Sequence, residues 1–122
     1  MTREEFKART KAYALRVIKV VDALPRDSVA KVLGHQLLRS GTSVGANYRA
    51  SIRARSRPDF IAKMGIVEEE CDESLFWMEL LVDSGRMKAD RLMELMREGG
   101  EILAITVASI KTARRGRSSD RT

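Results

Sequence analysis

The chain has 122 residues, which suits a single domain with a modest hydrophobic core. It has one cysteine, which excludes an internal disulfide, and no apolar run that approaches the roughly 20 residues of a membrane span. The net charge of +6 favours an acidic partner such as nucleic acid over a membrane, and a charged N-terminus without an apolar segment predicts a cytoplasmic protein.

The first predicted helix covers residues 2–23, where apolar residues recur every three or four positions. Its opposite face is basic, and we expect this face either to be solvated or to contact nucleic acid. That face carries Arg3, Lys7, Arg9, Lys11, Arg16 and Lys19. A turn around Pro25 leads to the second predicted helix, for which Asp27 or Ser28 is the expected cap.

The second predicted helix covers residues 28–55 and organises the rest of the chain. It is rich in Gly, Ser, Thr and Asn, which usually mark turns, but its apolar and small residues follow a helical period. Gly41 and Gly45 lie on one face of this helix and form a strip without side chains. We therefore expect another helix to approach closely there.

The third predicted helix begins at Ser56, which has the spacing of a capping box with Asp59, and ends at Gly85. Phe76 and Trp77 are adjacent and therefore point to different sides of this helix. Two apolar faces on one helix favour oligomerisation, because a monomer would leave one of them exposed.

The fourth predicted helix covers about residues 87–111 and contains Gly99 and Gly100, where we expect either a bend or the close approach of a neighbour. Residues 113–122 are predicted to form a basic disordered tail. Four helices joined by short turns predict an all-α fold, an antiparallel up-down-up-down four-helix bundle over residues 1–112.

The charges of two consecutive segments are complementary, because residues 26–57 are mainly basic and residues 58–84 are mainly acidic. Part of the basic charge is therefore expected to be used inside the protein or between subunits. The spacing of polar residues on the second and third helices predicts a structural polar network that sets their register. Its members are Arg39, Ser43, Asn47, Glu70 and Glu73.

Signatures of enzymes are mostly missing from the sequence. His35 has no second ligand at metal-binding spacing, and the glycine-rich segment of the second helix lacks the Lys-Ser/Thr pair of a phosphate-binding loop. Cys71 lies on an apolar stripe, which is typical of a small buried residue. An acid/base pair of Glu70 and Glu73 is the only enzymatic alternative, and we predict a protein without catalytic activity, metal or other cofactor.

Three motifs resemble one bacterial protein family. They are R-S-G-T-S-V-G-A-N-Y-R-A-S at residues 39–51, S-x-x-D-F-I-x-K-M at residues 56–64, and E-E-x-x-E-S-x-F-W-M-E-L-L at residues 69–81. The motifs resemble the four-helix-bundle proteins encoded in intervening sequences of large-subunit ribosomal RNA genes. That family includes the accessory variability proteins of diversity-generating retroelements, and the resemblance covers about residues 5–110.

The resemblance implies a four-helix protomer that assembles into a ring-like homopentamer with a basic surface. In the retroelement members this surface binds nucleic acid and a partner reverse transcriptase, whereas the free-standing members have no established activity. The chain departs from the family pattern around Arg49, where many members carry an acidic residue. This difference makes the second helix more basic and favours nucleic-acid binding, but it does not identify the branch of the family.

The leading hypothesis is a non-enzymatic, oligomeric accessory protein that binds RNA or an RNA–DNA hybrid through backbone phosphates, with low sequence specificity. Its predicted nucleic-acid-binding residues are Arg49, Arg53, Arg55, Arg57, Arg114, Arg115 and Arg117. The alternative is a protein-interaction scaffold, in which the arginines bind acidic residues of neighbouring subunits and have no direct nucleic-acid role.

Overall fold

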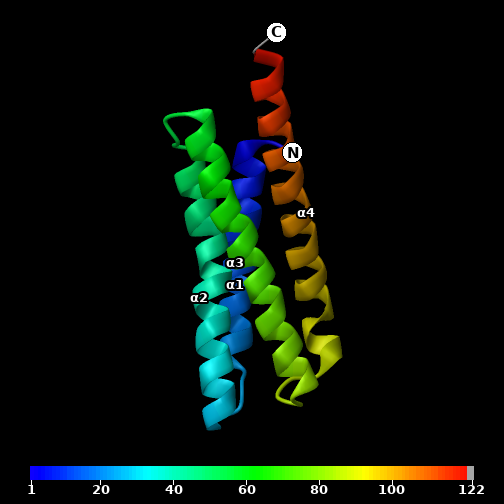
Figure 1. Cartoon of the computed structure of the whole chain (residues 1–122). Coiled ribbons are helices and arrows are strands. Elements are labelled where there is room, and N and C mark those ends of the chain that lie inside the picture. Colours follow the sequence, from blue (N-terminus) through cyan, green and yellow to red (C-terminus); the bar gives the residue numbers. More distant parts are fainter. Residues whose placement is uncertain (121–122) are drawn as a thin grey trace.

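The computed structural model describes residues 1–120, and the side chains of residues 1–116, as a bundle of four helices (Figure 1). The helices are α1 (Arg3–Asp22), α2 (Ser28–Ser51), α3 (Arg57–Asp83) and α4 (Ala89–Asp120). Consecutive helices run in opposite directions, so the predicted all-α four-helix bundle is confirmed. None of these helices contains an apolar stretch of the length that spans a bilayer.

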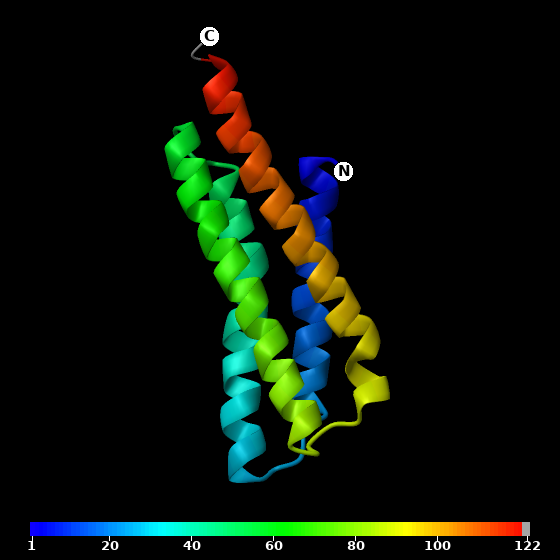
Figure 2. The same ribbon diagram turned by 45° about the vertical axis from the view of Figure 1, so that its right-hand side comes forward.

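The helices differ in how closely they pack. α2 lies between α1 and α3 and contacts both along its length, whereas α4 packs along α3 and touches α1 only lightly. Figures 1 and 2 show that α4 extends beyond the other helices at the end of the bundle that also holds the N-terminus. The bundle therefore has a weakly packed seam between its first and last helices.

Local hydrogen bonds fix the starts of the first three helices. The side chains of Thr2, Asp27 and Ser56 each accept a hydrogen bond from the backbone amide three residues later, at 3.1, 2.9 and 3.2 Å. α3 ends before Gly85, whose φ of 78° is a left-handed conformation that favours glycine. The predicted start and end of the third helix are confirmed.

Two helix ends differ from the predicted ones. α2 ends at Ser51 rather than at residue 55, and residues 52–55 form the turn that leads to Ser56, whose extended backbone (φ −155°, ψ 164°) caps α3. α4 continues to Asp120, whereas the sequence predicts a disordered tail from residue 113. The segment that follows residue 112 begins with Ala and Arg, which are good helix formers, and has no proline to stop the helix.

Glycines leave room for side chains of neighbouring helices at several positions. A Cβ atom at Gly41 would lie 2.9 Å from both γ-methyl carbons of Val17, so α1 approaches α2 at the predicted strip. A Cβ atom at Gly99 would lie 2.8 Å from the hydroxyl oxygen of Tyr13, whereas one at Gly100 would meet no atom within 4 Å. Of the two adjacent glycines in α4, Gly99 therefore leaves room for the Tyr13 side chain, whereas Gly100 faces open space.

Candidate nucleic-acid interface

One end of the bundle brings together three basic segments that are distant in the sequence. The first turns of α1, the α2–α3 turn and the C-terminal part of α4 all lie at this end (Figures 1 and 2). We call it the basic end. It comprises Arg3, Lys7, Lys11, Arg49, Arg53, Arg55, Arg57, Arg114 and Arg115. The side chain of Arg117, also predicted to bind nucleic acid, lies outside the described part of the structure.

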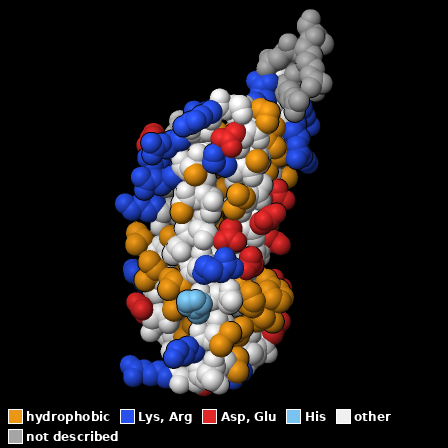
Figure 3. All heavy atoms as spheres, turned by 60° about the vertical axis from the view of Figure 1, so that its left-hand side comes forward, with side chains coloured by type: hydrophobic (Ala, Val, Ile, Leu, Met, Phe, Trp, Pro, Cys, Tyr) orange, Lys and Arg blue, Asp and Glu red, His pale blue; other side chains and the backbone are white. Residues whose placement is uncertain are grey.

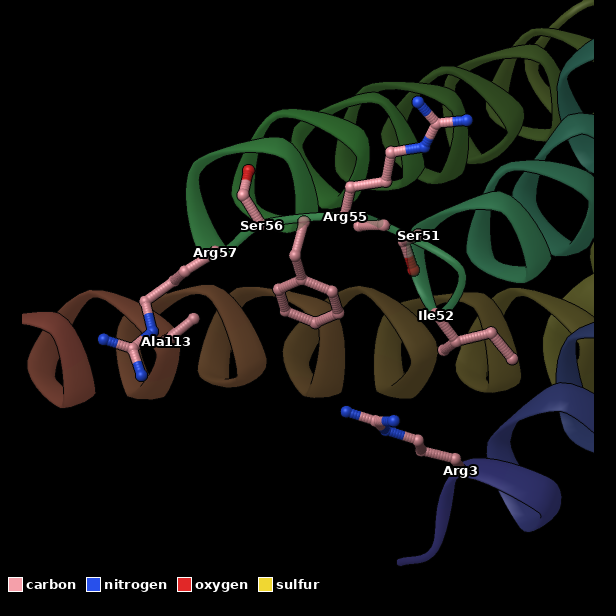
Figure 4. Close-up of a pocket in the computed structure, with 9 residues that line it drawn as sticks. Arg3, Ser51, Ile52, Arg55, Ser56, Arg57 and Ala113 are labelled. Carbon is pink, nitrogen blue, oxygen red and sulfur yellow. The ribbon is translucent and has the colours of Figure 1, made fainter.

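An open pocket of about 390 Å³ lies where the α2–α3 turn meets α1 and α4 (Figure 4). Its basic lining residues are Arg3, Arg55 and Arg57. In Figure 4 the side chain of Arg57 reaches over α4 beside Ala113, and Arg3 points toward α4 from the start of α1. Arg55 also lines the pocket, but its guanidinium group points away from α4, over α3, so the two arginines of this turn extend in different directions.

A second depression, the α1–α2 groove, lies between the N-terminal half of α1 and the C-terminal half of α2. It has a volume of about 470 Å³ and no acidic residue in its lining. The lining residues are Lys7, Thr10, Lys11, Ala14, Thr42, Gly45, Ala46 and Arg49. The structure therefore places Arg49 with the lysines of α1 rather than with Arg55 and Arg57 in the end pocket.

Another part of the basic charge is neutralised within the protein. Arg39 of α2 binds Glu70 at 3.2 Å and also binds Glu73, both on α3, and 44% of its side chain is exposed. Ser43 and Asn47 donate hydrogen bonds to backbone carbonyls of their own helix, at 2.6 and 2.8 Å. Of the three α2 residues in the predicted polar network, Arg39 alone forms an ion pair with α3 among the described interactions, and this ion pair lies at the protein surface.

A further ion-pair cluster joins α1 to α4 across the weakly packed seam. Arg9 binds Glu98 at 2.7 Å and also binds Glu101. The hydrogen bonds from Arg9 hold the pKa of Glu98 below its usual range, although partial burial opposes this shift. This cluster was not predicted, because no local spacing in the sequence relates α1 to a helix so far along the chain.

The residues considered for catalysis have other roles in the structure. Glu70 and Glu73 both bind Arg39. Burial raises the pKa of the Cys71 thiol to about 12, so the reactive thiolate is scarce at neutral pH. His35 is exposed, and the described residues contain no group of three His, Cys, Asp or Glu side chains arranged to hold a metal ion.

Large apolar side chains are exposed away from the basic end. Val29 and Val32 on α2 are 43% and 61% exposed, and Phe76 on α3 is 49% exposed. Figure 3 shows the single histidine between two hydrophobic areas, while most Lys and Arg side chains of this face lie nearer its upper end. Exposed apolar side chains gathered in this way are typical of a protein–protein contact.

The sequence profile of the family described as 23S rRNA-intervening sequence protein matches residues 4–108. The chain belongs to this family. It is also similar to a protein of unknown function from the S23 ribosomal protein family of Bacteroides thetaiotaomicron VPI-5482, whose crystal structure was solved at 1.70 Å resolution. The two are 32% identical with a TM-score of 0.84, over 91% of this chain and 99% of that one. No curated protein sequence matches the chain.

This match confirms membership of the intervening-sequence family, which the three motifs predict. In the structure the first motif, at residues 39–51, lies in the C-terminal half of α2, and the other two lie on α3. The motifs include both sides of the Arg39 to Glu70 ion pair and the glycine that α1 approaches. The three motifs therefore contain residues that pack α2 against its two neighbours.

Proposed function

We propose that this member of the 23S rRNA-intervening sequence protein family is a non-enzymatic, oligomeric accessory protein that binds RNA or an RNA–DNA hybrid. It binds backbone phosphates and has low sequence specificity. The observation that carries the proposal is the basic end, where Arg and Lys side chains of α1, of the last turn of α2 and of the α2–α3 turn line two open depressions that have no acidic lining residue.

The residue types of the basic end fit phosphates better than bases. Arginine presents several N–H donors in a fixed fork that matches phosphate oxygens, and lysine adds a mobile positive charge. Phe60 is the one aromatic residue in the lining of the two depressions, so base stacking contributes little. Because phosphate binding releases counterions, affinity falls steeply as salt rises.

The proposal includes assembly into a ring-like homopentamer in the cytoplasm. The exposed Val29, Val32 and Phe76 support a contact between copies of the chain that lies away from the basic end. The resemblance of the three motifs to the retroelement members of the family supports five subunits. The same resemblance supports a reverse transcriptase as a protein partner. In such an assembly the basic ends of several protomers bind one nucleic-acid molecule, and this multivalency raises the overall affinity for that molecule.

Charge reversal at the α2–α3 turn tests the proposal. The R53E/R55E variant changes two exposed residues of the basic end, and the R26E/R91E variant makes the same charge change at exposed positions near the opposite end. We expect R53E/R55E to lose RNA binding at moderate salt with its oligomer intact, as measured by fluorescence anisotropy and light scattering. R26E/R91E should keep most of the binding.

The scaffold alternative makes the opposite prediction for the same variants. Acidic residues on the outer side of α3, including the exposed Glu69 and Asp72, are available to bind arginines of a neighbouring subunit. If the arginines serve assembly, R53E/R55E dissociates the oligomer. An unchanged RNA affinity of R53E/R55E, or equal losses in both double variants, would contradict binding at the basic end.

A further inference from the structure

The α1–α2 groove is open because most of its lining residues are small. Apart from its basic residues, the lining consists of Thr10, Ala14, Thr42, Gly45 and Ala46. A Cβ atom at Gly45 would lie 3.2 Å from the Thr10 hydroxyl oxygen, so the two helices approach closely at the bottom of the groove. Ala46 is exposed, so its methyl group leaves the groove accessible from solvent.

The positive charges of the groove are arranged along its two sides. Lys7 and Lys11 lie one helical turn apart on α1, about 6 Å along its axis, and Arg49 lies on α2. Neighbouring phosphates of an extended nucleic-acid strand are separated by a similar distance. None of the three side chains forms an ion pair with another described residue, so all three are available to bind an external anion.

We infer that this groove holds one strand of single-stranded RNA, an inference that rests on the proposed function and specifies the form of its ligand. Packed helices are separated by about 8–10 Å, which is narrower than a nucleic-acid duplex. A duplex therefore contacts only the edges of the groove. A single strand places its phosphates against the lysines and Arg49, and its sugars against the small residues between them.

The polar groups of the groove give little basis for reading a sequence. The hydroxyls of Thr10 and Thr42 donate to the backbone carbonyls of Lys7 and Leu38, at 3.0 and 2.7 Å. Their donors are therefore satisfied within the helices, and no Asn, Gln or acidic side chain lines the groove. The groove selects for the single-stranded form and is tolerant of the base sequence.

The test uses the full chain and two variants that act on the groove. A46E adds a carboxylate at an exposed helical position between the basic side chains, and K7Q/K11Q removes two of the three positive charges. A104E adds the same carboxylate at an exposed position of α4 and is the matched control. The probes are a labelled oligouridylate and an RNA duplex of equal length, titrated at several salt concentrations, with protein mass checked by light scattering.

We expect wild type and A104E to prefer the oligouridylate, and A46E to bind it at least tenfold more weakly at the same salt. K7Q/K11Q should lower the slope of log affinity against log salt by about 1.4, since each phosphate contact to a single strand contributes about 0.7. Equal affinity of wild type for duplex and single strand, or unchanged binding by A46E, overturns the groove assignment and leaves the proposed function standing. If wild type binds neither probe, the proposed function fails as well.

Discussion

Substitution of the two adjacent glycines of α4 by alanine should have opposite effects on stability. A Cβ atom at Gly99 would lie 2.8 Å from both the Tyr13 hydroxyl and a δ-methyl carbon of Leu75, whereas one at Gly100 would meet nothing within 4 Å. The Leu75 methyl can move by a rotamer change. Tyr13 cannot move freely, because it is fully buried and its hydroxyl forms a 2.8 Å hydrogen bond with Ser74.

The magnitudes follow from three contributions. Replacing glycine by alanine within a helix favours folding by about 1 kcal/mol at either position. At Gly99, overpacking costs about 1–3 kcal/mol, and a weakened buried hydrogen bond of Tyr13 adds about 1 kcal/mol or more. G99A should therefore be destabilised by about 1–3 kcal/mol, while G100A should be stabilised by up to about 1 kcal/mol.

Thermal unfolding followed by circular dichroism measures this difference, with all proteins at the same protomer concentration. A free-energy difference of about 2 kcal/mol corresponds to about 6–10 °C in Tm for a domain of this size. G65A is a second control, because a Cβ atom at Gly65 would also meet nothing within 4 Å. A Tm of G99A equal to or above that of G100A would refute the close approach of Tyr13 to α4.

Three further predictions test other parts of the structure. E98Q should lower Tm at pH 7 because it removes the charge that binds Arg9. This effect should fade as the pH falls below about 4, because a carboxylate with a lowered pKa stabilises the fold only while it is ionised. An equal change in Tm at pH 7 and pH 3 would argue against the pairing of Glu98 with Arg9. Cys71, whose pKa is raised to about 12 by burial, should resist iodoacetamide at pH 8 until the protein is unfolded, and stoichiometric labelling of the native protein by mass spectrometry would contradict its burial. S56A should destabilise the protein by about 1 kcal/mol because it removes the cap of α3, and an unchanged Tm would show that this hydrogen bond is dispensable.

The features that depend on local sequence could be predicted. The start of α3 follows from the spacing of Ser56 and Asp59, and the close approach of another helix to α2 follows from Gly41 and Gly45 on one helical face; the structure shows that this helix is α1. The ion pair of Arg39 with Glu70 follows from complementary charges on consecutive helices. These features relate residues in the same helix or in neighbouring helices, whose relative position a short turn largely determines.

Features that depend on which helix faces align could not be predicted. The seam cluster of Arg9 and Glu98 joins the first helix to the last, and no spacing in the sequence relates them. Lys7 and Arg49 line one groove because α1 and α2 align in a particular register, which periodicity alone does not give. Arg55 lines the end pocket while its guanidinium group turns away from α4, and the spacing of the arginines in the turn does not give this direction.

The proposed function depends on the basic end binding the phosphates of a nucleic acid. Its most direct test is a titration of the wild-type protein with RNA and with duplex DNA at several salt concentrations, on protein whose mass has been measured by light scattering. We expect an oligomer that binds RNA, with log affinity falling steeply and linearly with log salt concentration. A well-formed oligomer that binds neither ligand, or binds with an affinity that salt does not change, would contradict the proposed function.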